Sequence, residues 1–295
     1  MKIDPISLRL FVAAMEEKTI AAAAARQCIA ASAASRRLAE LEQQLDVTLF
    51  TRSNKGMAPA PAAYALLNLA RTVLNDLDSI GAQMLSWGSG MLGQVRVAAN
   101  ISAITQFLPA DLKSFLTHYP GVQIQLDEQI SSQVAQSVLS NTADLGILNE
   151  GQYGDGLQFI SYREDELVLV TPQGHPLTEQ ASVRMTDALP YDFVGAHLGS
   201  AINNQLIVAA ALAKAPLRMR IHVTSFDAMC LMVSAGLGIG VLPAGSARLY
   251  TRALGLTTRP LAEPWARRRL VIAVRGDASR SSATQLLIRH LTGAA

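Results

Sequence analysis

The sequence predicts a multidomain α+β protein in three parts: a small helical domain ending in a β-hairpin, a long connecting helix and a larger α/β region. Three observations predict this class. Apolar residues near the N-terminus recur with helical spacing, residues 62–80 contain neither glycine nor proline, and strand-like and helix-like segments alternate after residue 92. Because half of the 295 residues are apolar and only 16% are charged, the chain can bury two or three cores and is not intrinsically disordered.

One long stretch without formal charge, Ala228–Ala247, has the length of a membrane span. It contains four glycines and Pro243, which favour a helix, a tight turn and a buried strand instead. Near the start of the chain, Asp4 and Arg9 interrupt the continuous apolar core that a signal peptide needs. We therefore expect a cytoplasmic protein without a membrane partner.

The two cysteines, Cys28 and Cys230, allow at most one disulfide, and neither has histidine or further cysteine at the spacing of a metal site. This usage fits a reducing compartment. Small buried side chains are the commoner role of free cysteines, and Cys28 falls in a predicted helical core. We expect a structural role for both residues in preference to redox sensing.

The motifs of common enzyme classes are absent from the sequence. It has no Gly-x-Ser-x-Gly, no phosphate-binding loop and no His-Glu-x-x-His, and its five histidines are scattered singly. Gly236–Gly240 has some likeness to a dinucleotide-binding turn, but it precedes a predicted strand instead of following one. The sequence therefore predicts no enzyme, no cofactor and no metal site.

Charge is unevenly distributed along the chain. Residues 1–58 contain eight Lys or Arg against six Asp or Glu, whereas the rest of the chain contains 17 of each. The whole net charge of +2 therefore lies in the N-terminal region. Such a modest basic field is suggestive of a nucleic-acid contact made by this region alone.

Two helices are predicted at the N-terminus. The apolar residues of the first recur at i, i+3, i+4 and i+7, which is one face of an α-helix. They are Leu8, Phe11, Val12 and Met15. Thr19 offers an N-cap oxygen to the second helix, which extends from Ile20 to about Gln27 and contains a run of alanines. Because alanine is small and has high helix propensity, this run predicts close packing between helices.

A third helix is predicted after a short break at Cys28–Ala30. Its buried stripe consists of Ala34, Leu38, Leu41 and Leu45. The opposite face carries Ser32, Ser35, Arg36 and Ala39. Small residues let a helix lie close to base edges, and arginine pairs bidentately with guanine or phosphate, so this face suits the major groove of DNA. A solvated face on an ordinary helical domain is the alternative that the pattern leaves open.

A hairpin with a charged tip is predicted next. Val47–Phe50 is expected to be a short strand, and Arg52–Gly56 a basic turn. Such a hairpin, placed after a recognition helix, is a wing whose Arg52 and Lys55 contact the phosphate backbone or the minor groove.

Short motifs between residues 8 and 71 follow one another in the order of a known family and without gaps. They are Phe11-Val12-Ala13, Ala23-Ala24, Ser35-Arg36-Arg37-Leu38, Leu41-Glu42, Leu49-Phe50-Thr51-Arg52 and Gly56. This segment resembles the N-terminal domain of LysR-type transcriptional regulators, although Ala31-Ser32 and Pro59–Ala63 depart from the usual family residues. The resemblance implies a winged helix-turn-helix domain that binds double-stranded DNA. The DNA-binding residues that it implies are Ala31, Ser32, Ser35, Arg36, Arg37, Arg52 and Lys55.

A long connecting helix is predicted from Ala62 to about Trp87. Its apolar residues form a heptad-like seam of Leu67, Ala70, Leu74, Leu77, Gly81 and Met84, and a second stripe of Leu66, Leu69, Val73 and Ile80. A helix that is apolar on two sides can pack on its own domain and on a partner helix. The family resemblance favours dimerisation here over a core helix of a larger domain. Ser86–Gly93, with its three glycines, is predicted to be a hinge.

The remaining chain alternates strands and helices, which predicts a parallel sheet. Expected strands are 94–99, 122–126, 143–148, 167–171, 192–195, 219–223, 239–242 and 269–274, and expected helices are 104–118, 132–139, 201–212, 226–235 and 282–291. Two α/β lobes joined by two crossing strands resemble the periplasmic-binding-protein-like effector domain of the same family.

Ligands in such folds bind between the lobes, at the carboxyl ends of strands and against helix N-termini. The loops after the first strand of each lobe therefore supply the main candidates, with walls from neighbouring elements. The candidate effector-binding residues are Asn100, Ile101, Ser102, Ala103, Gly146, Leu148, His197, Gly199, Ser200, Phe226 and Val241. An ordinary cap or core role is the alternative for each. Ile101, Ala103 and Ile104 favour an aromatic or partly apolar ligand over a dedicated anion.

The sequence as a whole predicts a regulator that binds DNA and responds to a small-molecule effector. We expect a DNA-binding domain at 1–58, a linker helix and hinge at 59–91, and an effector-binding domain at 92–295, with lobe I at about 92–162 and 268–295 and lobe II at about 163–267. A homodimer or homotetramer would form through the linker helix and the effector domain. The alternative is an oligomeric small-solute-binding protein without specific DNA binding, in which Arg36→Ala leaves every function intact.

Overall fold

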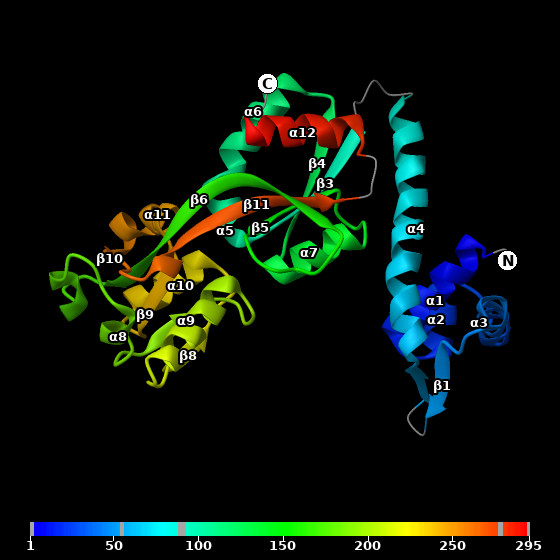
Figure 1. Ribbon diagram of the computed structural model, residues 1–295, viewed down its shortest axis with the longest axis horizontal. Helices are drawn as coiled ribbons and strands as arrows, with labels where there is room; N and C mark the ends of the chain where they lie inside the picture. The colour runs from blue at the N-terminus through cyan, green and yellow to red at the C-terminus, as the bar shows by residue number, and fades with distance from the viewer. Residues whose placement is uncertain (1–2, 54–55, 88–92, 277–279, 294–295) are drawn as a thin grey trace. The chain divides into compact units, whose positions relative to one another are not determined.

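The structure is a computed structural model that describes residues 3–53, 56–87, 93–276 and 280–293 (Figure 1). The chain forms two compact units. One comprises Met1–Met91 together with Ser140–Thr142, and the other comprises Leu92–Leu139 and Ala143–Ala295. Each unit has its own apolar core and is described by itself.

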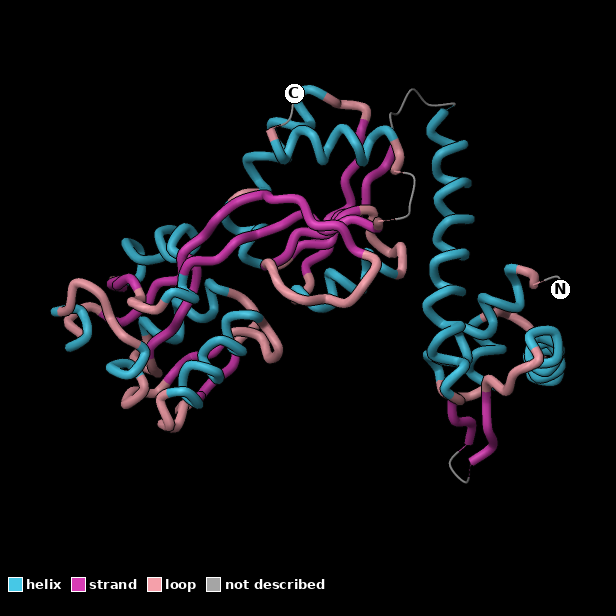
Figure 2. The backbone as a smooth tube through the Cα atoms, viewed as in Figure 1, coloured by secondary structure: helices cyan, strands magenta, loops and turns pink. Residues whose placement is uncertain are grey.

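The first unit is a helical domain with a two-stranded hairpin. Its elements are α1 (Pro5–Glu17), α2 (Ile20–Arg26), α3 (Ala31–Leu45), β1 (Phe50–Ser53), β2 (Gly56–Pro59) and α4 (Pro61–Trp87). The strands pair antiparallel from Phe50 opposite Pro59 to Ser53 opposite Gly56. The three predicted N-terminal helices and the hairpin are therefore present, and the helices surround one core (Figures 1 and 2).

Local capping explains where these helices begin. The Asp4 carboxylate accepts hydrogen bonds from the backbone N–H and the hydroxyl of Ser7, at 3.0 and 2.7 Å. The predicted Thr19 cap is present, because its Oγ1 accepts from the backbone N–H of Ala22 at 3.2 Å. Ala23 and Ala24 are fully buried, so the alanine run provides the close helix contact that its composition indicates.

Two expectations for this unit are wrong in detail. The first strand begins at Phe50 and not at Val47, because the backbone N–H of Val47 donates to the Glu42 carbonyl at 3.2 Å and that of Leu49 donates to the Glu42 carboxylate, so the end of α3 holds the segment before Phe50. Cys28 is exposed instead of lying in the helical core. It follows α2 with φ of 54°, in the turn that redirects the chain toward α3.

The connecting helix α4 has two different apolar faces. Ala63, Ala70 and Leu74 are buried in the core of the unit, and α4 packs against α1. Another set remains exposed by 40–66%, namely Leu69, Val73, Leu77 and Ile80. The helix extends through Ser86 to Trp87, so the predicted hinge begins later than expected. Its residues 88–92 lie outside the described residues.

The second unit has one mixed sheet that extends through two lobes. Among the described residues its strand order is β4-β3-β5-β11-β6-β9-β7-β8, with β10 beside β6. The strands are β3 (Gly93–Ala99), β4 (Val122–Glu128), β5 (Leu145–Asn149), β6 (Leu157–Pro172), β7 (Phe193–Gly195), β8 (Met219–His222), β9 (Ile239–Pro243), β10 (Leu256–Pro260) and β11 (Arg267–Arg275). In lobe I, β3 lies between β4 and β5, and in lobe II, β7 lies between β8 and β9, all parallel.

Helices cover both lobes of the sheet (Figure 1). They are α5 (Ile101–Gln106), α6 (Leu108–His118), α7 (Ser131–Leu139) and α12 (Ser282–Thr292) in lobe I, and α8 (Met185–Ala188), α9 (Ala201–Leu212), α10 (Phe226–Ser234) and α11 (Ala244–Leu254) in lobe II, with short 3₁₀ turns at Pro176–Glu179 and Pro264–Ala266. The two long antiparallel strands β6 and β11 join the lobes, as expected of the crossing strands (Figure 2).

The structure differs from the sequence prediction at several places in this unit. The single helix expected over Ile104–His118 is broken at Phe107, because Pro109 has no N–H to bond the Thr105 carbonyl and its ring cannot continue the turn. Strand β6 starts ten residues earlier than expected, since its first half pairs with β11. Helix α11 and strand β10 were not anticipated.

The glycine turn before β9 is as predicted. Gly236 and Gly238 have φ of 76° and 151°, which side-chain-bearing residues rarely adopt. A Cβ on Gly238 would lie 2.6 Å from the Asp192 carbonyl oxygen. None of the helices within the described ranges is both long enough and apolar enough to cross a membrane.

Candidate functional site

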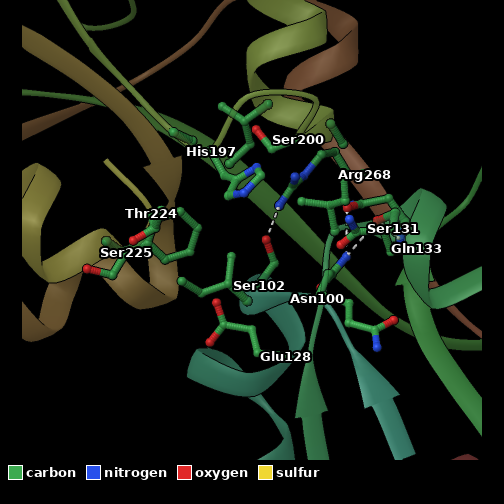
Figure 3. A pocket seen from close by; sticks show the side chains of 18 residues that line it. Asn100, Ser102, Glu128, Ser131, Gln133, His197, Ser200, Thr224, Ser225 and Arg268 are labelled. Carbon is green, nitrogen blue, oxygen red and sulfur yellow. Dashed lines mark hydrogen bonds between the residues drawn. The ribbon is translucent and has the colours of Figure 1, made fainter. Parts of the chain in front are cut away.

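A cavity of about 140 Å³ lies between the two lobes of the second unit. Lobe I lines it with Asn100, Ile101, Ser102, Glu128, Gln129, Ile130, Ser131, Gln133 and Asn149, lobe II with Ala196, His197, Ser200, Ala201, Ile202, Thr224, Ser225 and Phe226, and crossing strand β11 with Arg268. The labelled polar side chains in Figure 3 come from elements that are far apart in the sequence and meet only here.

Parallel strands and helix caps position most of these groups. The chain leaves β3, β5, β7 and β8 at the edge of the sheet that borders the cavity, as expected for the carboxyl ends of parallel strands. Asn100 caps α5, Ser200 caps α9 and Ser225 caps α10, each by accepting a hydrogen bond from the backbone N–H three residues later, at 2.9, 3.3 and 3.5 Å. The caps fix these side chains at the wall of the cavity.

Three buried polar residues form a network on the lobe I side. Asn100 Nδ2 donates to the Ser131 hydroxyl at 3.2 Å and to Asn149 Oδ1 at 2.9 Å. The backbone N–H of Asn149 donates to the same hydroxyl at 3.3 Å. All three residues are less than 9% exposed. The network joins the ends of β3 and β5 to the start of α7 and holds these polar groups in place.

A buried ion pair forms the floor of the cavity. Arg268 Nε donates to Asp165 Oδ1 at 2.8 Å, and Nη2 donates to Asp165 Oδ2 and to the Ser102 hydroxyl, the latter at 3.2 Å. The two side chains are only 8% and 1% exposed. Gln106 Nε2 adds a further hydrogen bond to Asp165, at 3.1 Å. This network fixes the guanidinium, which points toward Ser102 and the interior of the cavity in Figure 3.

Helix α5 of lobe I also forms hydrogen bonds with α11 of lobe II. The hydroxyls of Thr105 and Ser246 are 2.7 Å apart, and the backbone N–H of Gly245 donates to Gln106 Oε1 at 3.2 Å. Gly245 and Ser246 lie in the first turn of α11 in lobe II. The same six-residue helix therefore lines the cavity at its N-terminal end and contacts the opposite lobe at its C-terminal end.

The structure brings together six of the eleven residues predicted to bind an effector: Asn100, Ile101, Ser102, His197, Ser200 and Phe226. The other five, Ala103, Gly146, Leu148, Gly199 and Val241, are not among the residues that line the described cavity. Ala103 and Val241 are buried in the cores of the two lobes. Gly146 and Leu148 are two residues apart on β5 and face α7, where a Cβ on Gly146 would lie 2.6 Å from Val134.

Several lining residues were missed by sequence reasoning, for two different reasons. Ser131, Thr224 and Ser225 stand where a strand is followed by a helix, so the rule that selected Ser102 and Ser200 also finds them. Asn149 ends β5, where the same rule applies. Arg268 carries no such signal, because it lies within a strand and reaches the cavity only through the crossing of β6 and β11.

Four of the seven predicted DNA-binding residues are exposed on α3 of the first unit, and a fifth, Arg37, points away from them. Ala31, Ser32, Ser35 and Arg36 are exposed on α3, and the Arg36 side chain is 79% exposed beside Glu40. Arg37 instead turns toward α1, where its Nη1 donates to Asp4 at 3.3 Å and to Ser7 at 3.4 Å. The side chain of Arg52 and the whole of Lys55 lie outside the described residues.

The arrangement defines a class of protein: a helix-turn-helix unit with an exposed recognition face, followed by a two-lobed unit with a polar cavity. Comparisons with known proteins agree with this class. Residues 88–295 match the family model of the LysR substrate binding domain, and residues 6–64 match that of the bacterial regulatory helix-turn-helix protein, lysR family. The chain therefore belongs to the LysR family and is a LysR-type transcriptional regulator with an effector-binding domain, not an enzyme.

Some individual relatives match nearly the whole chain, and others match about two thirds of it. The uncharacterized HTH-type transcriptional regulator YbhD of Escherichia coli (strain K12) is 29% identical over 287 residues, which are 97% of this chain and 90% of that protein. The crystal structure of full-length CbnR complexed with its target DNA superposes with a TM-score of 0.70 at 19% identity, covering 99% and 100% of the two chains. The effector binding domain of QuiR in complex with shikimate superposes with a TM-score of 0.61 at 17% identity, and the match covers 68% of this chain and 96% of that one.

Proposed function

We propose that this LysR-type regulator binds operator DNA through α3 and the β1–β2 hairpin, binds a small effector in the interlobe cavity, and couples the two events through its oligomeric assembly in the cytoplasm. The observation that carries the proposal is the cavity itself. Side chains from both lobes and from a crossing strand meet there, so a ligand that contacts all of them changes the relative stability of lobe arrangements.

The DNA-binding part of the proposal rests on the exposed face of α3. Ser32, Ser35 and Arg36 are exposed on that helix, which has a buried opposite face and is therefore held rigidly. The two small serines let the helix approach the bases, and their hydroxyls and the Arg36 guanidinium are donors that suit readout in the major groove. CbnR, whose fold this chain shares, is described as bound to its target DNA. We keep the predicted boundary of the DNA-binding domain at residue 58 and that of the linker at residue 91.

The oligomeric part rests on α4. Leu69, Val73 and Ile80 are 66%, 46% and 57% exposed on a helix whose other apolar face is already buried. An exposed apolar stripe along a long helix favours packing against a second copy. A dimer would present two recognition helices to the two halves of an operator.

A mobility shift of the full-length protein against the intergenic DNA beside its own gene tests the DNA-binding part. With excess competitor DNA, we expect a shift that weakens strongly between about 50 and 200 mM salt, since phosphate contacts release counterions. Arg36→Ala should abolish the competitor-resistant shift. The matched control is Arg252→Ala, which removes the same charge from an exposed position on α11 and should leave the shift unchanged.

An equal shift by Arg36→Ala and the unchanged protein would contradict the assignment of α3 as the reading helix. A folded, oligomeric protein that gives no competitor-resistant shift would point to the alternative, a solute-binding protein without specific DNA binding.

A further inference from the structure

One buried donor in the cavity wall has no acceptor. Asn149 is 7% exposed, its Oδ1 accepts from Asn100, and its backbone N–H donates to Ser131. Its Nδ2 has no hydrogen-bond partner among the described residues. Buried N–H groups are nearly always paired in folded proteins, so this unpaired amide, whose nitrogen has less than 1 Å² of accessible surface, indicates that a ligand supplies the acceptor after displacing the atoms that cover it in the cavity wall.

A second donor group lies on the crossing strand. The Nε and Nη2 atoms of Arg268 are occupied by Asp165 and Ser102, whereas its Nη1 makes no hydrogen bond with any described residue. Because the side chain is 8% exposed and lines the cavity, this nitrogen is held there without rotational freedom. A preorganised guanidinium edge of this kind is the usual partner of a carboxylate.

Three helices direct their N-termini at the same cavity. The first residues of α7, α9 and α10 line it, and these helices contain nine, twelve and nine residues. First-turn N–H groups lack partners within their helix and carry partial positive charge, which favours an anion. The carboxylates near the site do not oppose this. Asp165 is bonded to Arg268 and Gln106, and Glu128 is exposed to solvent.

We propose that the effector is a small carboxylic acid, bound as its carboxylate between Arg268 Nη1 and Asn149 Nδ2, with an apolar body against Ile101, Ile202 and Phe226. This inference deepens the proposed function and rests on it. A cavity of about 140 Å³ is close to the size that holds one benzene-sized molecule, so the acid has about six to ten non-hydrogen atoms. The expectation from sequence of a partly apolar ligand is kept, and an anionic group is added to it.

Thermal-shift and calorimetric titrations of the full-length protein test the charge of the ligand. The probes are straight-chain and cyclic carboxylic acids of six to ten non-hydrogen atoms, each paired with its primary amide, which has the same shape without the charge. We expect saturable binding of at least one acid, and binding of its amide weaker by about tenfold or more. Amides that bind as tightly as their acids, or a set of acids none of which binds at millimolar concentration, would overturn the proposal.

Variants then test the two donors with the acid that binds. Asn149→Leu keeps the approximate side-chain shape and leaves the Arg268–Asp165 ion pair in place, and it should weaken binding of the acid by about tenfold. Arg268→Gln should weaken it at least as much, whereas Arg269→Gln, its 62%-exposed neighbour on β11, should not. Glu128→Gln should strengthen binding, because it removes a like charge. Stronger binding in Arg268→Gln together with weaker binding in Glu128→Gln would indicate a cationic ligand and would reject the carboxylate.

The mobility shift of the wild-type protein, with and without the bound acid, separates the two levels of inference. Absence of specific DNA binding would reject the proposed function while leaving the carboxylate site to be judged by the titrations. Specific DNA binding by a protein that binds no acid would reject the carboxylate site alone.

Discussion

At the scale of single residues, Arg268–Asp165 is the most deeply buried ion pair among the described residues. Both side chains are nearly inaccessible, and removing one partner leaves a buried charge without compensation. Arg268→Met should lower the free energy of unfolding by about 3–5 kcal/mol. The double variant with Asp165→Asn should lose less than Arg268→Met alone, because neither charge then remains buried.

Urea unfolding followed by circular dichroism measures these differences, and Arg269→Met serves as the control on the exposed side of the same strand. Strictly additive losses in the double variant would show that the two side chains do not stabilise one another.

His175 gives a second residue-scale prediction, for pH. Burial lowers the pKa of His175 from its ordinary value, its Nδ1 accepts from the backbone N–H of Leu177 at 3.3 Å, and its ring packs on Tyr191 at 4.5 Å. The unfolded state therefore binds a proton more readily than the folded state. Stability from this group is complete above the unfolded pKa of about 6.5 and is lost as pH falls from there through the lower pKa of the folded state.

Thermal unfolding of the wild-type protein between pH 7.5 and 5 should show this loss. His175→Asn supplies a neutral oxygen to the same N–H and should reduce the dependence on pH. An identical pH dependence in the two proteins would assign the loss to other groups.

At the scale of elements, α5 connects the cavity to the opposite lobe. Thr105 Oγ1 bonds both the Ile101 carbonyl at 2.8 Å and the fully buried Ser246 hydroxyl. Thr105→Val should lower the free energy of unfolding by about 1–3 kcal/mol, because it leaves the Ser246 hydroxyl buried without its partner. Thr117→Val is the matched control, since Thr117 makes the same bond to the carbonyl four residues earlier but is exposed.

The two variants are compared by urea unfolding of the full-length protein. Equal effects at Thr105 and Thr117 would mean that the contact between α5 and α11 adds nothing to stability. The contact could not be predicted from the sequence, because α11 itself lacked a recognisable signal and its partner lies 141 positions away.

At the scale of the whole molecule, assembly depends on the exposed stripe of α4. Replacing both Leu69 and Val73 with glutamate should shift the protein toward the monomer, because charge on a buried helix seam opposes association. Asn68→Glu, which places one charge beside the stripe on the same helix, should leave the assembly intact. Light scattering coupled to size exclusion measures the mass. An unchanged mass of the double variant would place the principal interface elsewhere.

The helical domain is the part of the molecule that the sequence by itself determined. Helical spacing of apolar residues, the Thr19 cap and the small, exposed residues of α3 are local properties, and the structure has each of them where the sequence predicts it. The alternation of strands and helices likewise predicted two α/β lobes and the loops that supply Asn100, Ser102 and Ser200 to the cavity. Local hydrogen bonding and periodicity suffice for these features.

Only the tertiary structure decided what else lies in the cavity. Gly146 and Leu148 end up facing α7 because the pleat of β5 gives them the core side, whereas Asn149 at the end of the same strand reaches the cavity. Arg268 reaches it because β11 crosses between the lobes beside β6, with Arg268 opposite Asp165. The register of β11 against β6 and the direction of the Arg268 side chain arise from pairing between segments about 100 residues apart. No local pattern in either segment specifies them.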